Sequence, residues 1–309
     1  LIANDYYDMS RGLRNACREI EFRDVSARSI VPVLRDICRR EGIEFENDVV
    51  VGEDISARYL KKKHDAVVLA LGCREPRRIP VPGDELEGVH YALDYLTAST
   101  KVLHGEWPST SLIDAKDKRV LVLGGGDTGA DCVGTANRQG AAQVYQFEIM
   151  PKPLEWEESW NPEWPDFPKI MRTSSSHKEG CERRWNIKTK KLYGRGVQVE
   201  KGIFSEVEWS TDKNGKWGMK EIPNSEFTLE VDMVIIAAGF TNVRHSRLLS
   251  DFDVALNERG NIAVDQSGHT SVRGVFAAGD AVTGASLVVK AMSQGRFVAD
   301  KVNEYLRGL

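Results

Sequence analysis

The feature that most constrains the fold of this chain is a glycine-rich turn between an apolar run and a helix-like segment. The stretch RVLVLGGGDTGADCVGTANRQG, residues 119–140, fits the pattern G-x-G-x-x-G. In this pattern the first glycine permits a tight turn, the second lets the backbone approach a pyrophosphate, and the third lets helix and strand pack closely. Amide N–H groups at the start of the helix favour the negative phosphates. We therefore predict a dinucleotide-binding unit, rather than a plain glycine-rich connection, with these contact residues: Gly124, Gly125, Gly126, Asp127, Thr128 and Gly129.

The strand predicted after this helix, AQVYQFEI, ends at an acidic residue, Glu148. A carboxylate at this point can accept hydrogen bonds from the hydroxyls of the adenosine ribose and would repel a 2′-phosphate. This favours NADH over NADPH. The alternative is that Glu148 only faces solvent, and Arg138 and Lys152 lie near enough in the sequence to offset its charge. Both nucleotides therefore stay open, and the predicted ligand is NAD(P)H.

Three further apolar segments end in glycine. DAVVLALGC ends near Gly72, DMVIIAAGF ends near Gly239, and VFAAGDAV contains the pair Gly279-Asp280. Unbroken apolar runs of this kind are typical of parallel strands that are covered on both faces. Because open α/β sheets bind ligands at the carboxyl ends of their strands, Asp280 can accept a hydrogen bond from a ribityl hydroxyl of a flavin. The alternative is a surface turn.

A long amphipathic helix is predicted to begin near residues 285–287, so that Ser286 and Leu287 would lie at its positive end, beside the flavin N1–C2=O edge. Two strand segments that bracket a glycine fingerprint indicate two dinucleotide-binding domains, one inserted into the other. We predict three ranges: 1–116 and 241–309 as parts of a FAD-type domain, and 117–240 as the NAD(P)-binding domain.

The chain resembles the small (beta) subunits of glutamate synthase and their relatives among NAD(P)H-linked flavoprotein oxidoreductases. The resemblance runs from about residue 42 to the C-terminus. It rests on VLVLGGGDTGADCVGTANRQGA, EIMPKP, PKIMRTSSSHKEG, ERRWNIKTKKLYG, VIIAAGF and VFAAGD followed by GASLVVKAMSQGR. The resemblance implies an α/β fold with two Rossmann-like domains, FAD in the outer domain, NAD(P)H in the inserted one, and a large subunit that makes glutamate from glutamine and 2-oxoglutarate.

Some features of that family do not occur in this sequence. The cysteine-rich cluster domain and the first βαβ unit, with its own G-x-G-x-x-G for the FAD pyrophosphate, are missing, and Val282 and Thr283 stand where basic residues are usual. The first residue is not Met, which suggests a fragment or a processed chain. Three functions stay open: a flavoprotein subunit that feeds a partner, a related reductase with another acceptor such as ferredoxin, and a truncated module that binds dinucleotide without catalysis.

Composition excludes several other classes of function. A formal net charge of −4 gives no broad basic surface for nucleic acid or an anionic membrane. Five separated cysteines form no C-x-x-C pair, and the histidines form no H-E-x-x-H pair, so no metal site is predicted. No apolar run is long enough to span a membrane, and no signal peptide is visible. We expect a cytoplasmic protein, and an oligomer is possible.

No catalytic side chain is predicted, because hydride transfer between two cofactors needs orientation more than acid–base chemistry. The segment 151–193 is rich in Trp and Pro and is expected to be a long functional loop without regular elements, with Trp156, Trp160 and Trp164 as a packed core or a docking face. Within it, Arg172 and residues 174–177 line the nucleotide site or contact a partner, and His177 is expected to be a hydrogen-bonded loop residue rather than a catalytic one.

Hydrophobic periodicity predicts the remaining elements. Helices are expected at 29–42, where Gly42 stops the helix, and at 92–105, and strands at 43–45, 196–210 and 226–240. The segment 74–88, rich in Pro and Gly, is expected to be a loop.

Overall fold

The computed structural model describes residues 26–155, 170–213, 215 and 217–309. The chain divides into two compact units, residues 1–54 and 55–309. In the first unit, helix α2 (Ala27–Glu41) ends at Gly42, whose φ of 66° lies in the left-handed region. This confirms the predicted helix and its stop, because glycine adopts that conformation without steric cost. The strand predicted at 43–45 is wrong: these residues pair with no strand in the described part of the chain.

The second unit contains a five-stranded parallel sheet in the order β2-β10-β3-β4-β5. Its central strand β3 is the apolar run before the glycine turn, and it is buried on both faces, as expected for a parallel sheet covered on both sides. The strands are β2 (Val89–Tyr91), β3 (Arg119–Leu123), β4 (Gln143–Phe147), β5 (Glu182–Arg184) and β10 (Met233–Ile236).

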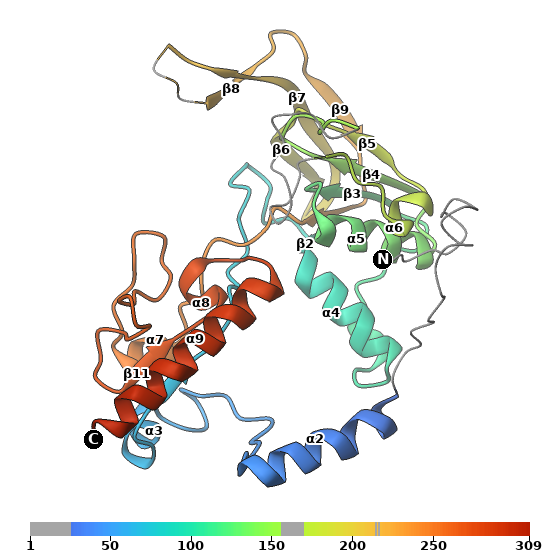
Figure 1. Ribbon diagram of the computed structural model, residues 1–309. Coiled ribbons are helices and arrows are strands. Elements are labelled where there is room, and N and C mark those ends of the chain that lie inside the picture. Colours follow the sequence, from blue (N-terminus) through green and yellow to red (C-terminus); the bar gives the residue numbers. More distant parts are fainter. Residues whose placement is uncertain (1–25, 156–169, 214, 216) are drawn as a thin grey trace, which may run out of the picture. The chain divides into compact units, whose positions relative to one another are not determined.

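One face of this sheet is covered by helices α4 (Ala92–Leu103) and α5 (Asp127–Arg138) (Figure 1). Val120 and Val122 of β3 point into this layer, where they pack with Tyr95 of α4 and Val133 of α5. The alternate side chains of β3 point to the other face, because successive residues of a strand face opposite sides. Both predicted helices are confirmed.

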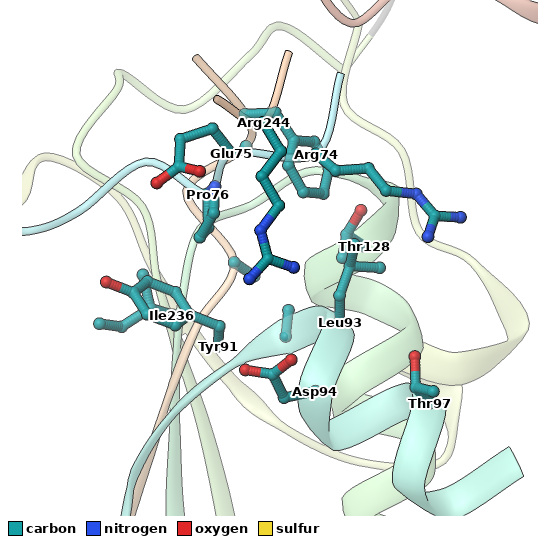
Figure 2. Close-up of a pocket in the computed structure, with 14 residues that line it drawn as sticks. Arg74, Glu75, Pro76, Tyr91, Leu93, Asp94, Thr97, Thr128, Ile236 and Arg244 are labelled. Carbon is teal, nitrogen blue, oxygen red and sulfur yellow. The ribbon is translucent and has the colours of Figure 1, made fainter. Parts of the chain in front are cut away.

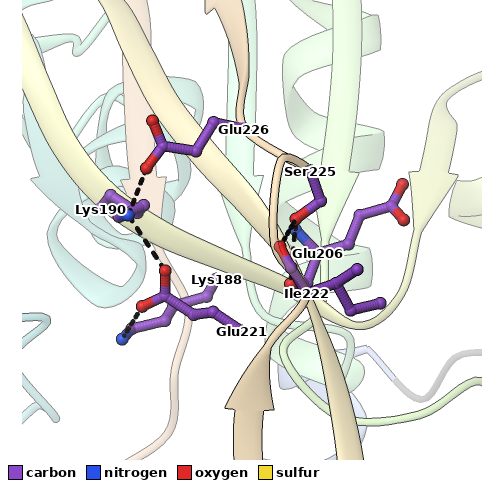
Figure 3. Close-up of polar contacts among 7 residues, drawn as sticks. All are labelled: Lys188, Lys190, Glu206, Glu221, Ile222, Ser225 and Glu226. Atoms are coloured by element: carbon purple, nitrogen blue, oxygen red, sulfur yellow. Dashed lines mark hydrogen bonds and ion pairs between the residues drawn. The ribbon is translucent and has the colours of Figure 1, made fainter.

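The other face of the sheet is covered by an antiparallel layer. Leu121 packs there with Phe147 and Phe204, whose rings meet edge to face at 5.2 Å. The strands of this layer are β6 (Ile187–Arg195), β7 (Gln198–Thr211), β8 (Trp217–Glu221) and β9 (Phe227–Glu230). Ion pairs join β6 to the end of β8 and to the connection that follows it: Glu221 of β8 contacts both Lys188 and Lys190, and Lys190 also contacts Glu226 of the connection (Figure 3). The lysines hold the pKa of Glu221 at about 2.

A separate pair of parallel strands joins the two ends of unit 2. Strand β1 (Val67–Leu69) pairs with β11 (Val275–Ala277), and the whole five-stranded sheet lies between them in the sequence. This pairing is consistent with an insertion of the five-stranded sheet between two parts of another domain, which stays a prediction. The helices of this part are α3 (Ala57–Lys63), α7 (Arg247–Phe252), α8 (Asp280–Thr283) and α9 (Val288–Arg307), and Val298 of α9 packs on Phe276.

Two predictions, about a domain boundary and about the segment 151–193, need revision. Strand β2 lies before the predicted boundary at residues 116 and 117, yet it pairs with β10, so we propose a boundary before Val89 that keeps the sheet in one domain. The segment 151–193 was expected to lack regular elements, but it includes α6 (Ser175–Lys178), β5 and most of β6. Strand β5 consists of charged residues, and β6 begins Ile-Lys-Thr-Lys-Lys, so neither contains the apolar run by which strands were predicted. Trp156, Trp160 and Trp164, predicted as a packed core or a docking face, lie outside the described residues.

Candidate functional site

The glycine turn joins β3 to α5, as predicted, and two of its glycines are needed for close packing. Gly124 has a φ of 128°, and a Cβ added there would lie 2.2 Å from the backbone oxygen of Ala237. A Cβ on Gly129 would lie 2.3 Å from the carbonyl oxygen of Gly124. Real Cβ atoms do not approach so closely, so both positions require glycine for the fold itself.

Gly126 is different, because a Cβ there would meet no atom within 4 Å. Its φ of −81° is open to any residue, and it is the N-cap of α5. The first N–H groups of a helix have no partner within the helix. The open space at Gly126 and these amides together form the kind of cradle that an anion fills at a helix N-terminus.

Glu148 follows β4 and lies beside the turn. Its Oε2 accepts a hydrogen bond of 2.6 Å from the backbone N–H of Gly125, and its Oε1 accepts one of 2.9 Å from the N–H of Met150. The carboxylate is therefore fixed in place next to the turn, and each oxygen keeps a lone pair for a further donor. Glu148 therefore does more than face solvent, because its carboxylate is hydrogen-bonded to the turn; its role toward a ribose stays a prediction.

A cavity of about 830 Å³ lies on the β4 side of the turn. Gly126 and Glu148 line it, and so do Arg172, Ser174 and His177 of the 151–193 segment. The side chains that form the apolar part of its wall are Met150, Leu154, Ile170, Met171, Trp185 and Trp217. Ser174 and His177 of the TSSSH segment thus line this cavity, and that the cavity holds the nucleotide stays a prediction.

A second cavity, of about 390 Å³, lies on the other side of the turn, at the carboxyl ends of β2 and β10. Thr128 of α5 and Gly239 line it, and in Figure 2 the side chains of Arg244 and Asp94 point into it from opposite sides. Because β3 lies between β10 and β4 in the sheet, the turn after β3 lies between the two cavities: Gly125 and Gly126 line the larger, and Thr128 of α5 lines the smaller. Parallel α/β sheets bind ligands at this edge.

The remaining predicted residues, apart from Gly239 after β10, lie in the β1–β11 part of unit 2. Gly72 and Gly239 have positive φ angles, and an added Cβ at either would meet nothing within 4 Å. Gly279 also has a positive φ, of 72°. Asp280 accepts a hydrogen bond of 3.0 Å from the hydroxyl of Ser286, which brings two of the predicted flavin contacts together.

Leu287 is the N-cap of α9, which agrees with the helix start predicted there. Val288 and Met292, in the first turns of α9, are largely exposed although both are apolar. The structure thus leaves an uncovered apolar surface at the positive end of a long helix, beside Asp280.

Sequence reasoning missed one residue that the structure places at the turn, Gln146. Its side chain is 2% exposed, and its Nε2 donates a hydrogen bond of 3.0 Å to the carbonyl oxygen of Gly124. Its Oε1 lies 3.0 Å from Nε2 of His177, so His177 is a hydrogen-bonded residue, as predicted. A polar residue within an apolar strand, two positions before Glu148, was the signal available for Gln146.

The described residues contain no group of three or more side chains suited to hold a metal ion, and none of their helices has the length and hydropathy of a membrane span.

Comparison with solved structures identifies the fold. FprA of Mycobacterium tuberculosis, solved in complex with NADPH, superposes with a TM-score of 0.62 at 14% identity, over 90% of this chain and 73% of that chain. At this identity the likeness concerns the fold alone. It confirms the predicted α/β class with Rossmann-like dinucleotide-binding domains.

Comparison of sequences is more specific. The glutamate synthase (NADPH) small chain of Mycobacterium tuberculosis strain H37Rv is 44% identical over 88% of this chain and 56% of its own length. The glutamate synthase (NADH) of Saccharomyces cerevisiae is 37% identical over 90% of this chain and 13% of its own. The chain therefore spans about half the length of the small chain that it matches. The pattern of pyridine nucleotide-disulphide oxidoreductases matches residues 20–295, and the chain belongs to this family.

Proposed function

We propose that this chain is part of an NAD(P)H-oxidising flavoprotein subunit that transfers hydride from NAD(P)H to FAD and passes electrons to a partner. One observation carries the proposal: a turn with an open cradle at Gly126 lies between two cavities at the carboxyl edge of a parallel sheet. A dinucleotide needs this division, with its pyrophosphate at the helix N-terminus and its two nucleosides on either side.

The larger cavity is assigned to the adenosine half. Glu148 lines it and is fixed so that its remaining lone pairs can accept hydrogen bonds from ribose hydroxyls. A fixed carboxylate also disfavours a 2′-phosphate, which supports NADH over NADPH. Arg183 lines the same cavity and has the opposite influence.

The smaller cavity is assigned to the nicotinamide half. It extends from Thr128 at the start of α5 to Gly239 after β10. Tyr91 and Ile236 line it and can shield the ring from water, while Asp94 and Arg244 supply polar groups for the carboxamide. These residues orient the ring; none needs to accept a proton, because hydride transfer moves two electrons and a proton together.

The residues of the β1–β11 part fit a flavin. Asp280, paired with Ser286, lies at the carboxyl end of β11, and Gly72, after β1, leaves open space beside the backbone. Gly239, after β10, leaves open space as well. The exposed apolar side chains at the start of α9 suit a flat aromatic ring, and the positive helix end favours negative charge on it. When bound, FAD supplies the acceptor for the hydride of the reduced nicotinamide.

The partner is proposed from the relatives. The bacterial relatives are named small chains of glutamate synthase, so we propose a large subunit that forms glutamate from glutamine and 2-oxoglutarate. A second candidate is a dinucleotide-binding module without catalysis. It is favoured by the β1–β11 sheet, which has only two strands among the described residues and leaves Val68 of β1 44% exposed.

The visible absorption spectrum of the purified chain, recorded with and without added FAD, tests the proposal. We expect flavin absorption that is lost when NADH is added without oxygen. A colourless protein that still binds NADH would support the module without catalysis, and a protein that binds neither cofactor would contradict both candidates. Glutamine-dependent glutamate formation with a large subunit then tests the acceptor.

A further inference from the structure

The buried pair Gln146 and His177 connects the TSSSH segment to the glycine turn. Gln146 is 2% exposed and His177 9% exposed, although both side chains are polar. Polar groups are buried at little cost only when their hydrogen bonds are made. Their contacts form a continuous path from Ser174 through His177 and Gln146 to the carbonyl of Gly124.

The direction of each hydrogen bond along this path is determined by its ends. The backbone N–H of Ser174 lies 3.1 Å from Nδ1 of His177 and can only donate, so Nδ1 accepts. A neutral ring then carries its hydrogen on Nε2 and donates to Oε1 of Gln146. The Gln146 amide is left with Nε2 toward Gly124, which is the donor that the carbonyl needs. Burial lowers the pKa of His177, and Arg183 lowers it further, so the neutral ring is favoured.

The receiving carbonyl belongs to the residue that sets the shape of the turn. The N–H of Gly124 donates to the carbonyl of Phe147 at 2.8 Å, and the next N–H, of Gly125, donates to Glu148. With the bond from Gln146, the peptide groups on both sides of Gly124 are hydrogen-bonded to residues of β4 or to Glu148, which follows it. The amides that follow, from Gly126 onward, are thereby left to face the open cradle.

The segment that carries His177 is itself attached to α5. Arg138 pairs with Glu179, and the side chain of Asn137 donates to the carbonyl of Gly180 at 2.7 Å. The ring of His177 also completes a capping box with Ser174 at the start of α6. These contacts give the ring one position relative to the turn.

We propose that Gln146 and His177 are positioning residues for the nucleotide: the neutral imidazole orients the Gln146 amide, which holds the Gly124 carbonyl so that the turn's free amides point at the pyrophosphate. This inference rests on the proposed function, because it assigns a role at the same turn. Neither residue touches the reacting atoms. Their effect is expected in nucleotide affinity.

Gln146→Glu and Gln146→Met test the proposal, with Gln139→Met as the matched control. Glutamate has the size of glutamine and can accept from His177, but its ionised carboxylate cannot donate to the Gly124 carbonyl. Methionine makes neither bond. Gln139 is also a glutamine with buried polar atoms, but its Oε1 accepts from Tyr95 and from the N–H of Ala115, at the far end of α5.

The dissociation constant of NADH is measured by fluorescence titration in folded protein. We expect an increase of about five- to tenfold for both Gln146 variants, as for loss of one buried hydrogen bond, and a change below about twofold for Gln139→Met. If Gln146 served packing alone, the isosteric Gln146→Glu would bind NADH like the wild type. That result would overturn the inference; should Gln146→Met not fold, the Gln146→Glu comparison decides. Failure of the wild-type chain to bind NADH would instead overturn the proposed function.

Discussion

Substituting the three glycines of the turn one at a time separates their role in the fold from their role in binding. For Gly126→Ala the added Cβ meets no atom within 4 Å, and the φ of −81° suits alanine. Reduced freedom of the unfolded chain favours the variant by about 0.4–1 kcal/mol, and a weaker N-cap disfavours it by a similar amount, about 0.5–1 kcal/mol. We expect a free energy of unfolding within about 1 kcal/mol of the wild type.

The other two glycines should behave differently. At Gly124 the positive φ alone costs about 1–3 kcal/mol for alanine, and the contact of 2.2 Å with the Ala237 carbonyl adds to this. We expect Gly124→Ala to lose about 3 kcal/mol or more. At Gly129 alanine is favoured in a helix by about 1 kcal/mol, but its Cβ would meet the Gly124 carbonyl at 2.3 Å, so a net loss of about 1–2 kcal/mol is expected.

Urea unfolding followed by circular dichroism measures these stabilities, and fluorescence titration measures NADH binding. Gly126→Ala should keep its unfolding midpoint and lose NADH affinity at least tenfold, about 1.4 kcal/mol, because the methyl group occupies the space the pyrophosphate needs. Gly126→Val should abolish binding. A folded Gly126→Ala protein with wild-type NADH affinity would refute the assignment of the cradle, whatever the other two variants show.

Three further outcomes are expected. NADH should bind more tightly than NADPH, and Glu148→Gln should reduce this preference, in competition titrations with the two nucleotides; equal affinities in the wild type would contradict the role of Glu148. The folded-state pKa of His177 lies below its usual value of 6.5, so the unfolded chain binds a proton first as the pH falls. The contribution of the neutral His177 ring to stability is therefore complete above pH 6.5 and is lost as the pH falls through the lowered pKa. Thermal unfolding measured from pH 8 to 5 should show a melting temperature that depends less on pH in His177→Gln than in the wild type. Burial raises the pKa of Cys132 to about 12, so a thiol reagent at pH 8 should modify Cys132 only after denaturation, as peptide mass spectrometry would show.

The sequence predicted the parts of the site in which one residue type has one physical use. Gly124 must have a positive φ, and Gly129 must leave room for a carbonyl, so a glycine pattern after an apolar run identifies the turn. Strands β1 and β11 were predicted from their apolar runs, because a strand that is covered on both faces needs apolar side chains at successive positions. The sequence pattern did not predict which strands pair with each other. Nothing in residues 89–91 indicates that β2 is the neighbour of β10.

The role of segment 174–180 depends on contacts that sequence periodicity does not encode. His177 was expected to be hydrogen-bonded, but its partner lies 31 positions earlier, at a buried position of β4 between Tyr145 and Phe147. A buried glutamine inside such a strand is costly unless both ends of its amide are used. The physical question for any such residue is therefore where its donor and acceptor go.

The donors and acceptors of Gln146 also connect the TSSSH segment to the glycine turn. The glycine turn leaves the carbonyl of Gly124 directed toward α5, where Gly129 leaves space for it, and this carbonyl needs a donor. Nε2 of Gln146 donates to the Gly124 carbonyl. The buried Oε1 of Gln146 then needs a donor of its own, and Nε2 of His177 lies 3.0 Å from it. The segment after β4 therefore belongs to the architecture of the turn, and its variation should change nucleotide affinity even where it touches no ligand atom.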